Sequence, residues 1–364
     1  MPPSLFTLLC AAALAQQTPP APVISPEVHP DRRVTFRFRA PSAKEVFLSR
    51  EAGPRIPMAK DDKGLWTLTT DPLEPDYYGY SFVTDGVSMM DPNNPLMKPN
   101  LLSPQSMVYV RGANAWDLRP NIAKGMLHRH FYHSPIVGDD RDYFVYTPPG
   151  YDPKASKSYP VLYLLHGFSD DASGWTAVGQ AHTILDNLIA DGKAKPMLIV
   201  MTLGYGAPEY VSRTNRDPAL RERSFQRFRD ALLGEVIPAV ERDYRASKST
   251  KDRAIAGLSM GGAESLFVGL NATERFSSIG AFSSGGMGND LEKSFPTLNA
   301  KANDRLRLLW IACGVDDRLI DSNRKFLEFL KSKDVKYQWK ETPGAHTWTV
   351  WRRYLSEFLP LLFR

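Results

Sequence analysis

Cysteine is scarce in this chain, and its scarcity excludes a fold held together by disulfides. The 364 residues contain two cysteines, Cys10 and Cys313. Cys10 falls in a segment that we expect to be cleaved off, so the remaining thiol would have no partner for an internal disulfide. Cys313 ends the apolar run 308–313, which favours a buried structural side chain over a reactive one.

The sequence also lacks long hydrophobic runs and a strong excess of one charge. No apolar stretch approaches the roughly 20 residues that a membrane-spanning helix needs. The formal net charge is only +5, and the basic residues are spread along the chain. Nucleic-acid-binding proteins gather basic residues on one face. We therefore expect no nucleic-acid partner, and no membrane contact after signal cleavage.

The N-terminus has the pattern of an export signal. Leu5–Leu14 is a short apolar run, and Ala13-Leu14-Ala15 offers the small residues that a signal peptidase accepts. We predict a signal peptide over residues 1–15, cleavage before Gln16, and a secreted or periplasmic protein. Residues 16–29 are rich in proline and small polar residues and are predicted to form a linker.

Residues 30–110 show short strands and no helical period. Val34–Phe38 alternates strictly between apolar and polar side chains, and Leu65–Thr69 and Tyr77–Val83 are further strand candidates between turn signals. The pattern predicts a small all-β sandwich with an immunoglobulin-like number of strands.

From residue 126 onward, apolar strands alternate with helices. The predicted strands are 161–166, 197–202, 254–258, 279–283, 306–313 and 336–340, and the predicted helices are 181–190, 221–244, 261–270, 323–331 and 348–358. Strands that are apolar throughout suit a sheet covered on both faces. This order predicts a mainly parallel, doubly wound α/β domain over residues 126–364, with the long helix bent near Pro238.

A sharp strand-to-helix turn is predicted at Ser259. Gly257-Leu258-Ser259-Met260-Gly261 fits the pattern G-x-S-x-G, with a strand before it and a helix of small residues after it. The flanking glycines permit a turn too tight for a Cβ atom, and the turn presents the serine oxygen above the sheet. Ser259 is therefore the predicted nucleophile of an α/β-hydrolase domain; the alternative is a glycine-rich helix start packed closely on the sheet.

A serine nucleophile needs a base, and this fold orders its triad as serine, acid, histidine. His346 is the only histidine after Ser259 and falls between the last predicted strand and helix. It is the predicted general base. The loop 314–318 contains two carboxylates, Asp316 and Asp317, and either could orient the imidazole.

Two backbone N–H groups should hold the charge that develops on a substrate oxygen. We assign them to Met260, directly after the nucleophile, and to Phe168, in the loop after an early strand. His166 precedes that loop, and we expect it to order the loop rather than act as a base.

Other side chains are candidates for binding. The aromatic candidates for a substrate cleft, each of which could equally belong to the core, are Trp175, Tyr205 and Trp348. The pocket is expected to take its shape from loops 168–180, 204–222 and 285–303. His128, His130 and His133 hint at a metal site, but no cysteine or carboxylate set accompanies them, which favours an edge strand. No metal or organic cofactor is expected.

Several of these segments together resemble carbohydrate esterase family 1, also called the esterase D-like family, which includes feruloyl and acetylxylan esterases. The resemblance covers about residues 130–364 and is carried by 141–152, 159–167, 257–262, 313–317 and 344–348. It implies an α/β-hydrolase fold, a serine esterase mechanism with an acyl-enzyme, and Asp317 as the acid, because the family usually uses the second residue of the pair.

The N-terminal module resembles the early-set type related to glycogen-binding modules, through segments 64–66, 78–82 and 91–92. The combination implies an esterase acting on feruloyl or acetyl esters of plant cell-wall xylan, with a polysaccharide or small ester as its partner. The alternatives are a siderophore (enterochelin-type) esterase and an acyltransferase of the same fold.

Overall fold

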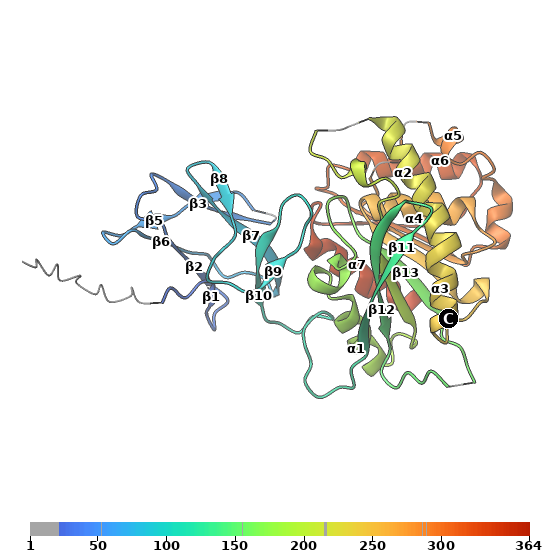
Figure 1. Cartoon of the computed structure of the whole chain (residues 1–364), viewed down its shortest axis with the longest axis horizontal. Helices are drawn as coiled ribbons and strands as arrows, with labels where there is room; N and C mark the ends of the chain where they lie inside the picture. The colour runs from blue at the N-terminus through green and yellow to red at the C-terminus, as the bar shows by residue number, and fades with distance from the viewer. Residues whose placement is uncertain (1–21, 52, 155, 215–216, 286, 289) are drawn as a thin grey trace, which may run out of the picture.

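The computed structural model describes residues 22–364 except 52, 155, 215–216, 286 and 289. The predicted signal peptide and the first part of the predicted linker lie outside these residues. The described chain forms two bodies, a β-module and a larger α/β domain, which lie side by side (Figure 1).

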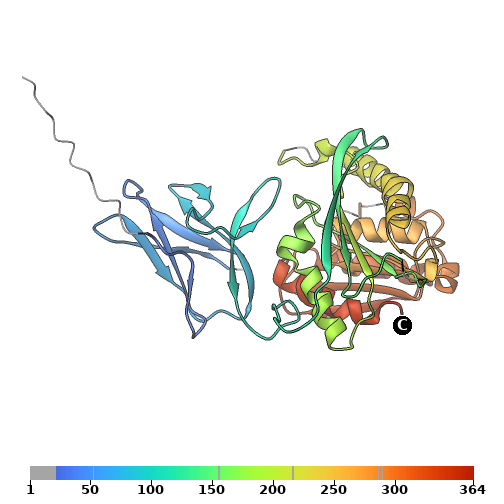
Figure 2. The ribbon, with the colours of Figure 1, turned by 60° about the horizontal axis from the view of Figure 1, so that its bottom comes forward.

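The β-module consists of two antiparallel sheets (Figure 2). One sheet has the order β1 (Glu27–Val28), β2 (Val34–Arg39), β6 (Leu65–Thr69), β5 (Ala59–Lys60). The other has the order β4 (Arg55–Pro57), β3 (Val46–Arg50), β7 (Asp76–Thr84), β10 (Gln105–Val110), β9 (Met97–Lys98), and β8 (Val87–Met89) also pairs with β7. Alternating side chains of both sheets fill the core between them, among them Phe36, Tyr80 and Phe82. Strand β1 falls inside the predicted linker, so the sandwich begins before residue 30.

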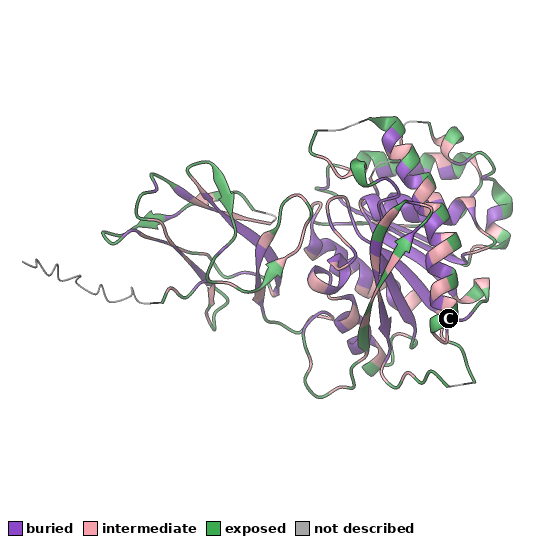
Figure 3. Ribbon diagram, viewed as in Figure 1, coloured by how far each residue is buried: buried purple, intermediate pink, exposed green. Residues whose placement is uncertain are grey.

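The larger domain is built on an eight-stranded sheet. Its order is β11 (Met126–Ser134), β12 (Asp139–Thr147), β14 (Leu198–Thr202), β13 (Val161–Leu165), β15 (Arg253–Leu258), β16 (Ser278–Phe282), β17 (Leu308–Gly314), β18 (Gln338–Thr342). The first two pairings are antiparallel and the others are parallel. The central strands are buried along their length (Figure 3), as their apolar sequences require.

Helices cover both faces of this sheet, which confirms the predicted α/β-hydrolase fold. One face carries α1 (Ala181–Ala190) and α7 (Trp348–Phe358), whose bounds match the predicted helices. The opposite face carries α2 (Pro218–Ala231), α3 (Ile237–Asp243), α4 (Met260–Asn271) and α6 (Ile320–Ser332). The single helix predicted over 221–244 is instead α2 and α3 joined by a π-helical turn at Leu232–Val236. Pro238 has no N–H to donate, and the wider turn precedes it.

A buried ion pair joins the two bodies. Arg352, on α7, donates from Nε to Asp76 Oδ1 at 2.8 Å, and its other nitrogens donate to the carbonyl oxygens of Val178 at 2.8 Å and Tyr77 at 2.7 Å. The Arg352 side chain is 0% exposed. Burial raises the pKa of Asp76 although Arg352 opposes this, so the carboxylate depends on the guanidinium for its charge.

We predict that Arg352→Ala lowers the free energy of unfolding by about 3–5 kcal/mol, because it leaves the buried Asp76 carboxylate without its charge partner and removes a donor from two carbonyl groups. Among the residues that the structure describes, only the Tyr77 N–H would still donate to Asp76 Oδ1. Urea unfolding would measure this loss. Arg353→Ala is the matched control on the same helix; its side chain is only partly buried, and a change within about 0.5 kcal/mol is expected. Equal losses in the two variants would contradict the assignment.

Candidate active site

Ser259 occupies a strained turn between β15 and α4. Its backbone has φ +52° and ψ −115°, a conformation that residues other than glycine rarely adopt. The turn is held from outside, because Ser259 N–H donates to Phe282 O at 2.8 Å and Ser259 O accepts from Gly285 N–H at 2.9 Å. A Cβ on Gly261 would lie 2.4 Å from His166 O. The motif glycine is therefore required by the close approach of the helix to the sheet.

The structure brings Ser259, His346 and Asp317 together in one line of hydrogen bonds. His346 Nε2 lies 2.9 Å from Ser259 Oγ, and His346 Nδ1 lies 2.8 Å from Asp317 Oδ2. An ionised carboxylate can only accept, so Nδ1 carries the hydrogen and the Nε2 lone pair faces the serine. This is the arrangement in which an imidazole can take a proton from a hydroxyl group.

The two neighbouring aspartates have different contacts. Asp317 has a buried side chain, and Oδ1 also accepts from Leu319 N–H at 2.9 Å. Burial opposes its ionisation, but the hydrogen bonds from His346 and Leu319 hold its pKa below the usual value. Asp316 is exposed and accepts from Gly344 N–H at 3.1 Å, which ties together the loops that carry the acid and the histidine.

The loop after β13 contacts the nucleophile. A Cβ on Gly167 would lie 3.4 Å from Ser259 Cβ. Within this loop His166 donates from Nδ1 to Gly167 O at 2.8 Å and accepts at Nε2 from Gly204 N–H at 2.9 Å. Burial lowers the pKa of His166 to about 4, so the ring is neutral near pH 7. These contacts fit the loop-ordering role expected for His166.

The two residues assigned to the oxyanion hole belong to the two segments that meet at Ser259. Met260 is the first residue of α4, and Phe168 follows Gly167 in the neighbouring loop. The Phe168 ring packs edge-on against Tyr205 and Tyr210. Their part in holding an oxyanion stays a prediction.

The three aromatic residues predicted to line a cleft belong to the core instead. Trp175, Tyr205 and Trp348 are 0%, 2% and 2% exposed. Trp175 donates to Leu165 O at 2.8 Å and packs edge-on against Trp348. Tyr205 donates to Asp170 O at 3.1 Å and so holds the loop after β13 in place. The positions of Trp175 and Tyr205 on predicted loops did not reveal that these loops fold back over the sheet.

The three early histidines lie on the edge strand β11, and each has a different partner. His128 contacts Thr147, His130 contacts Tyr244 at 2.6 Å, and His133 contacts Asp140. Within the described ranges, no three His, Cys, Asp or Glu side chains are grouped so that they could hold a metal ion. None of the helices in the described part of the chain is long and apolar enough to cross a bilayer.

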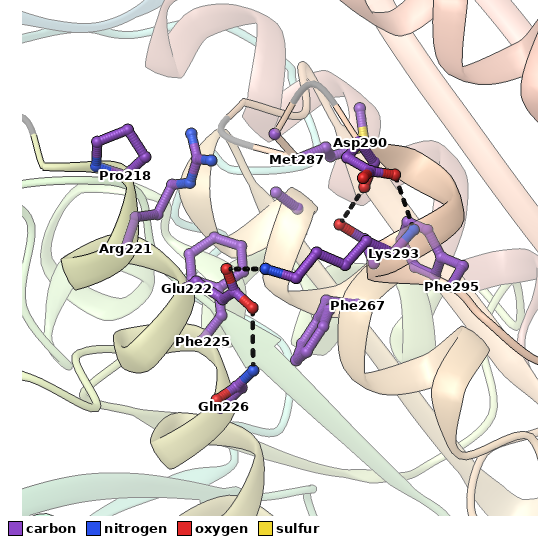
Figure 4. A pocket seen from close by; sticks show the side chains of 13 residues that line it. Pro218, Arg221, Glu222, Phe225, Gln226, Phe267, Met287, Asp290, Lys293 and Phe295 are labelled. Carbon is purple, nitrogen blue, oxygen red and sulfur yellow. Dashed lines mark hydrogen bonds and ion pairs between the residues drawn. The ribbon is translucent and has the colours of Figure 1, made fainter.

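A cavity of about 330 Å³ opens one helical turn from Ser259 (Figure 4). Ala263, whose N–H donates to Ser259 O at 3.1 Å, forms part of its wall. The apolar lining consists of Phe225, Phe267, Met287 and Phe295. At one side Lys293 pairs with Glu222 at 2.9 Å, whereas the Arg221 guanidinium makes no ion pair with any described residue. The walls come from α2, from α4 and from residues within the segment 285–303, which was expected to shape the pocket.

Known proteins are similar to this chain over most of its length. Residues 134–362, more than half of the chain, match the model of a family described as "Putative esterase". The chain is 29% identical over 347 residues to an endo-1,4-beta-xylanase/feruloyl esterase of Xylanibacter ruminicola. That match covers 93% of this chain and 46% of the relative, so the chain spans about half the length of that protein.

Two solved structures share the fold. A ferulic acid esterase of Anaeromyces mucronatus, in complex with ferulic acid, has a TM-score of 0.60 and 23% identity, and the match covers 70% of this chain and 96% of that one. The enterobactin esterase of Shigella flexneri has a TM-score of 0.65 and 19% identity, and the match covers 90% of this chain and 92% of that one.

Asp170 is a buried carboxyl group in the loop after β13, and its ionisation should make stability depend on pH. Burial raises its pKa to about 7 from an ordinary value of 3.8; Lys98 and the hydrogen bond from Asn100 oppose the rise, and Asp171 and Glu51 add to it. A carboxyl group whose pKa is raised by folding makes its full contribution to the stability of the folded state below about pH 4. This contribution is lost as the pH rises through about 7. Asp170→Asn cannot ionise and should be more stable than the wild type at pH 8.

Thermal unfolding between pH 5 and pH 8 measures this difference. The midpoint of Asp170→Asn should exceed that of the wild type by about 3 °C or more at pH 8, equivalent to roughly 1 kcal/mol, and the gap should narrow as the pH falls to 5, since it closes fully only below about pH 4. Asp171→Asn, one residue along the same loop, removes only a charge that adds to the rise in the Asp170 pKa, so its gap from the wild type should be smaller. A gap for Asp170→Asn that does not change with pH would refute the assignment.

Proposed function

This chain belongs to the esterase family whose model it matches, and from that premise we propose that it is a secreted serine esterase acting on feruloyl or acetyl esters of plant cell-wall xylan. The observation that carries the proposal is the hydrogen-bonded line from Ser259 through His346 to Asp317. The xylanase/feruloyl esterase relative supports the substrate class, and the predicted signal peptide supports secretion.

In the proposed first step, His346 Nε2 takes the proton from Ser259 Oγ while Oγ bonds to the ester carbonyl carbon. The carbonyl oxygen becomes an oxyanion, held by the N–H groups of Phe168 and Met260. The tetrahedral centre then expels the alcohol, which takes the proton from His346 Nε2. The acyl group stays on Ser259.

Water completes the cycle. His346 Nε2 takes a proton from water as the water oxygen attacks the acyl carbon, and the same proton returns to Ser259 Oγ when the acid leaves. Asp317 stays ionised throughout and stabilises the imidazolium that forms in each step. The N-terminus of α4, at Met260, favours the negative charge that develops beside it.

The cavity that Ala263 helps to line, one helical turn along α4 from Ser259, supports an aromatic acyl group over an acetyl group. Its size falls in the range of small-molecule sites, and three phenylalanine rings line it. A planar aromatic acyl group would cover those rings, whereas an acetyl group would leave them unfilled. The Arg221 guanidinium at its side, which makes no ion pair with the residues that the structure describes, is a donor for a phenolic oxygen.

A siderophore esterase is the second candidate. The fold shared with the Shigella flexneri enterobactin esterase covers 90% of this chain, which includes the β-module as well as the hydrolase domain. The match to the ferulic acid esterase covers 70% of this chain. An aromatic acyl group is also compatible with the cavity in this case, so substrate assays must separate the two candidates.

Product release from feruloylated, acetylated arabinoxylan is the decisive assay, with Ser259→Ala as the blank. We expect ferulate to be released by the wild type alone, because the variant lacks the attacking oxygen. Release of acetate alone would replace the feruloyl assignment with an acetylxylan esterase. If neither product is released, the xylan assignment fails and enterobactin becomes the substrate to assay.

The two aspartates provide a matched pair for the mechanism. Asp317→Asn should lower kcat by about 10⁴-fold, because an amide at this position favours the wrong imidazole tautomer. Asp316→Asn keeps an oxygen for the Gly344 N–H and should change kcat by less than about tenfold. Initial rates on p-nitrophenyl acetate measure both. Similar losses in the two variants would contradict the assigned acid.

A further inference from the structure

Helix α7 has its N-terminus capped by the other module. The helix begins at Trp348, two residues after His346, and Thr347 provides no side-chain cap. The first N–H groups of a helix have no partner within the helix and need an acceptor. Here Trp348 N–H donates to Glu51 Oε1 at 2.8 Å, from a residue 297 positions earlier in the chain.

Glu51 is itself held firmly in place. Its Oε2 accepts from Lys98 Nζ at 3.2 Å and from Gly79 N–H at 3.3 Å, and its side chain is 10% exposed. Burial opposes its ionisation, but Lys98, the Trp348 N–H and Arg352 outweigh burial and keep its pKa below the usual value. A buried carboxylate therefore lies at the positive end of the helix that follows the catalytic histidine.

A second contact of the β-module reaches the loop after β13. Asn100 Nδ2 donates to Ser169 Oγ and Asp170 Oδ1, both at 3.0 Å, and Leu101 N–H donates to Ser169 O at 2.7 Å. The Asn100 amide is oriented in turn, because its Oδ1 accepts from two backbone N–H groups of its own loop. Ser169 directly follows Phe168, the residue assigned to the oxyanion hole.

We propose that Glu51 and Asn100 are positioning residues of the esterase site, an inference that rests on the proposed function. Glu51 fixes the loop that carries the base, and Asn100 fixes the loop that carries an oxyanion donor. Neither touches the reacting atoms. Both loops are anchored from the same side, where the module faces α7 (Figure 1). The module is thus part of the catalytic architecture rather than a separate domain on a tether.

The test uses the full chain with p-nitrophenyl acetate. Glu51→Ala and Asn100→Ala should each lower kcat by about tenfold to a hundredfold, because misplacing a catalytic group by about 1 Å has an effect of this size. KM should change by less than about threefold, since neither residue contacts substrate. Glu51→Gln keeps an oxygen for the Trp348 N–H and should retain more activity than Glu51→Ala.

Two controls separate positioning from stability. Val108→Ala opens a space in the core of the β-module and should lower the unfolding midpoint without lowering kcat at 25 °C. Glu45→Ala removes an exposed carboxylate from the same module and should leave both unchanged. Equal kcat for Glu51→Ala and the wild type, or a kcat loss shared by Val108→Ala, would overturn the proposal while leaving the esterase assignment intact. A wild type without esterase activity overturns both.

Discussion

The constraint on which the site depends is the close packing of α4 against the ends of the central strands. Gly261 approaches the carbonyl oxygens of Leu165 and His166 so closely that a Cβ would clash with both. This contact forces the strained conformation of Ser259 and brings it against the loop that follows β13. The strain at one residue is offset by packing and backbone hydrogen bonds from three neighbouring segments.

The remaining parts of the site come from loops that the sheet places around this turn. The Asp317 loop follows β17 and the His346 loop follows β18, so parallel strands bring both to the same edge as Ser259. The neutral ring of His166 links the loops after β13 and β14 through its hydrogen bonds to Gly167 and Gly204. Outside this frame, the buried groups of the β-module hold the start of α7, so the arrangement extends beyond the hydrolase sheet.

Much of the fold and of the candidate site could be predicted from local sequence, and the features that could not be predicted have physical causes. The turn at Ser259 and the helices α1 and α7 follow from glycine placement and apolar periodicity. The pattern alone could not decide between Asp316 and Asp317. The two differ in burial and in their backbone donors, and neither property can be read from two adjacent aspartates in a loop. Trp175 and Tyr205 stayed open between cleft and core because sequence does not show how a loop folds over a sheet. The contact from Glu51 to Trp348 has no sequence signal, since its partner is a backbone N–H far along the chain.

The long separation between Glu51 and α7 has a consequence for the order of folding. A chain made from its N-terminus forms the sandwich while the last helix is still absent. Until α7 arrives, Glu51 lacks the Trp348 N–H and Asp76 lacks the Arg352 guanidinium. Docking of the final helix supplies both contacts in the same event. Completion of the reactive centre therefore coincides with the closing step of assembly, and a chain truncated before α7 would hold a finished sandwich beside an incomplete enzyme.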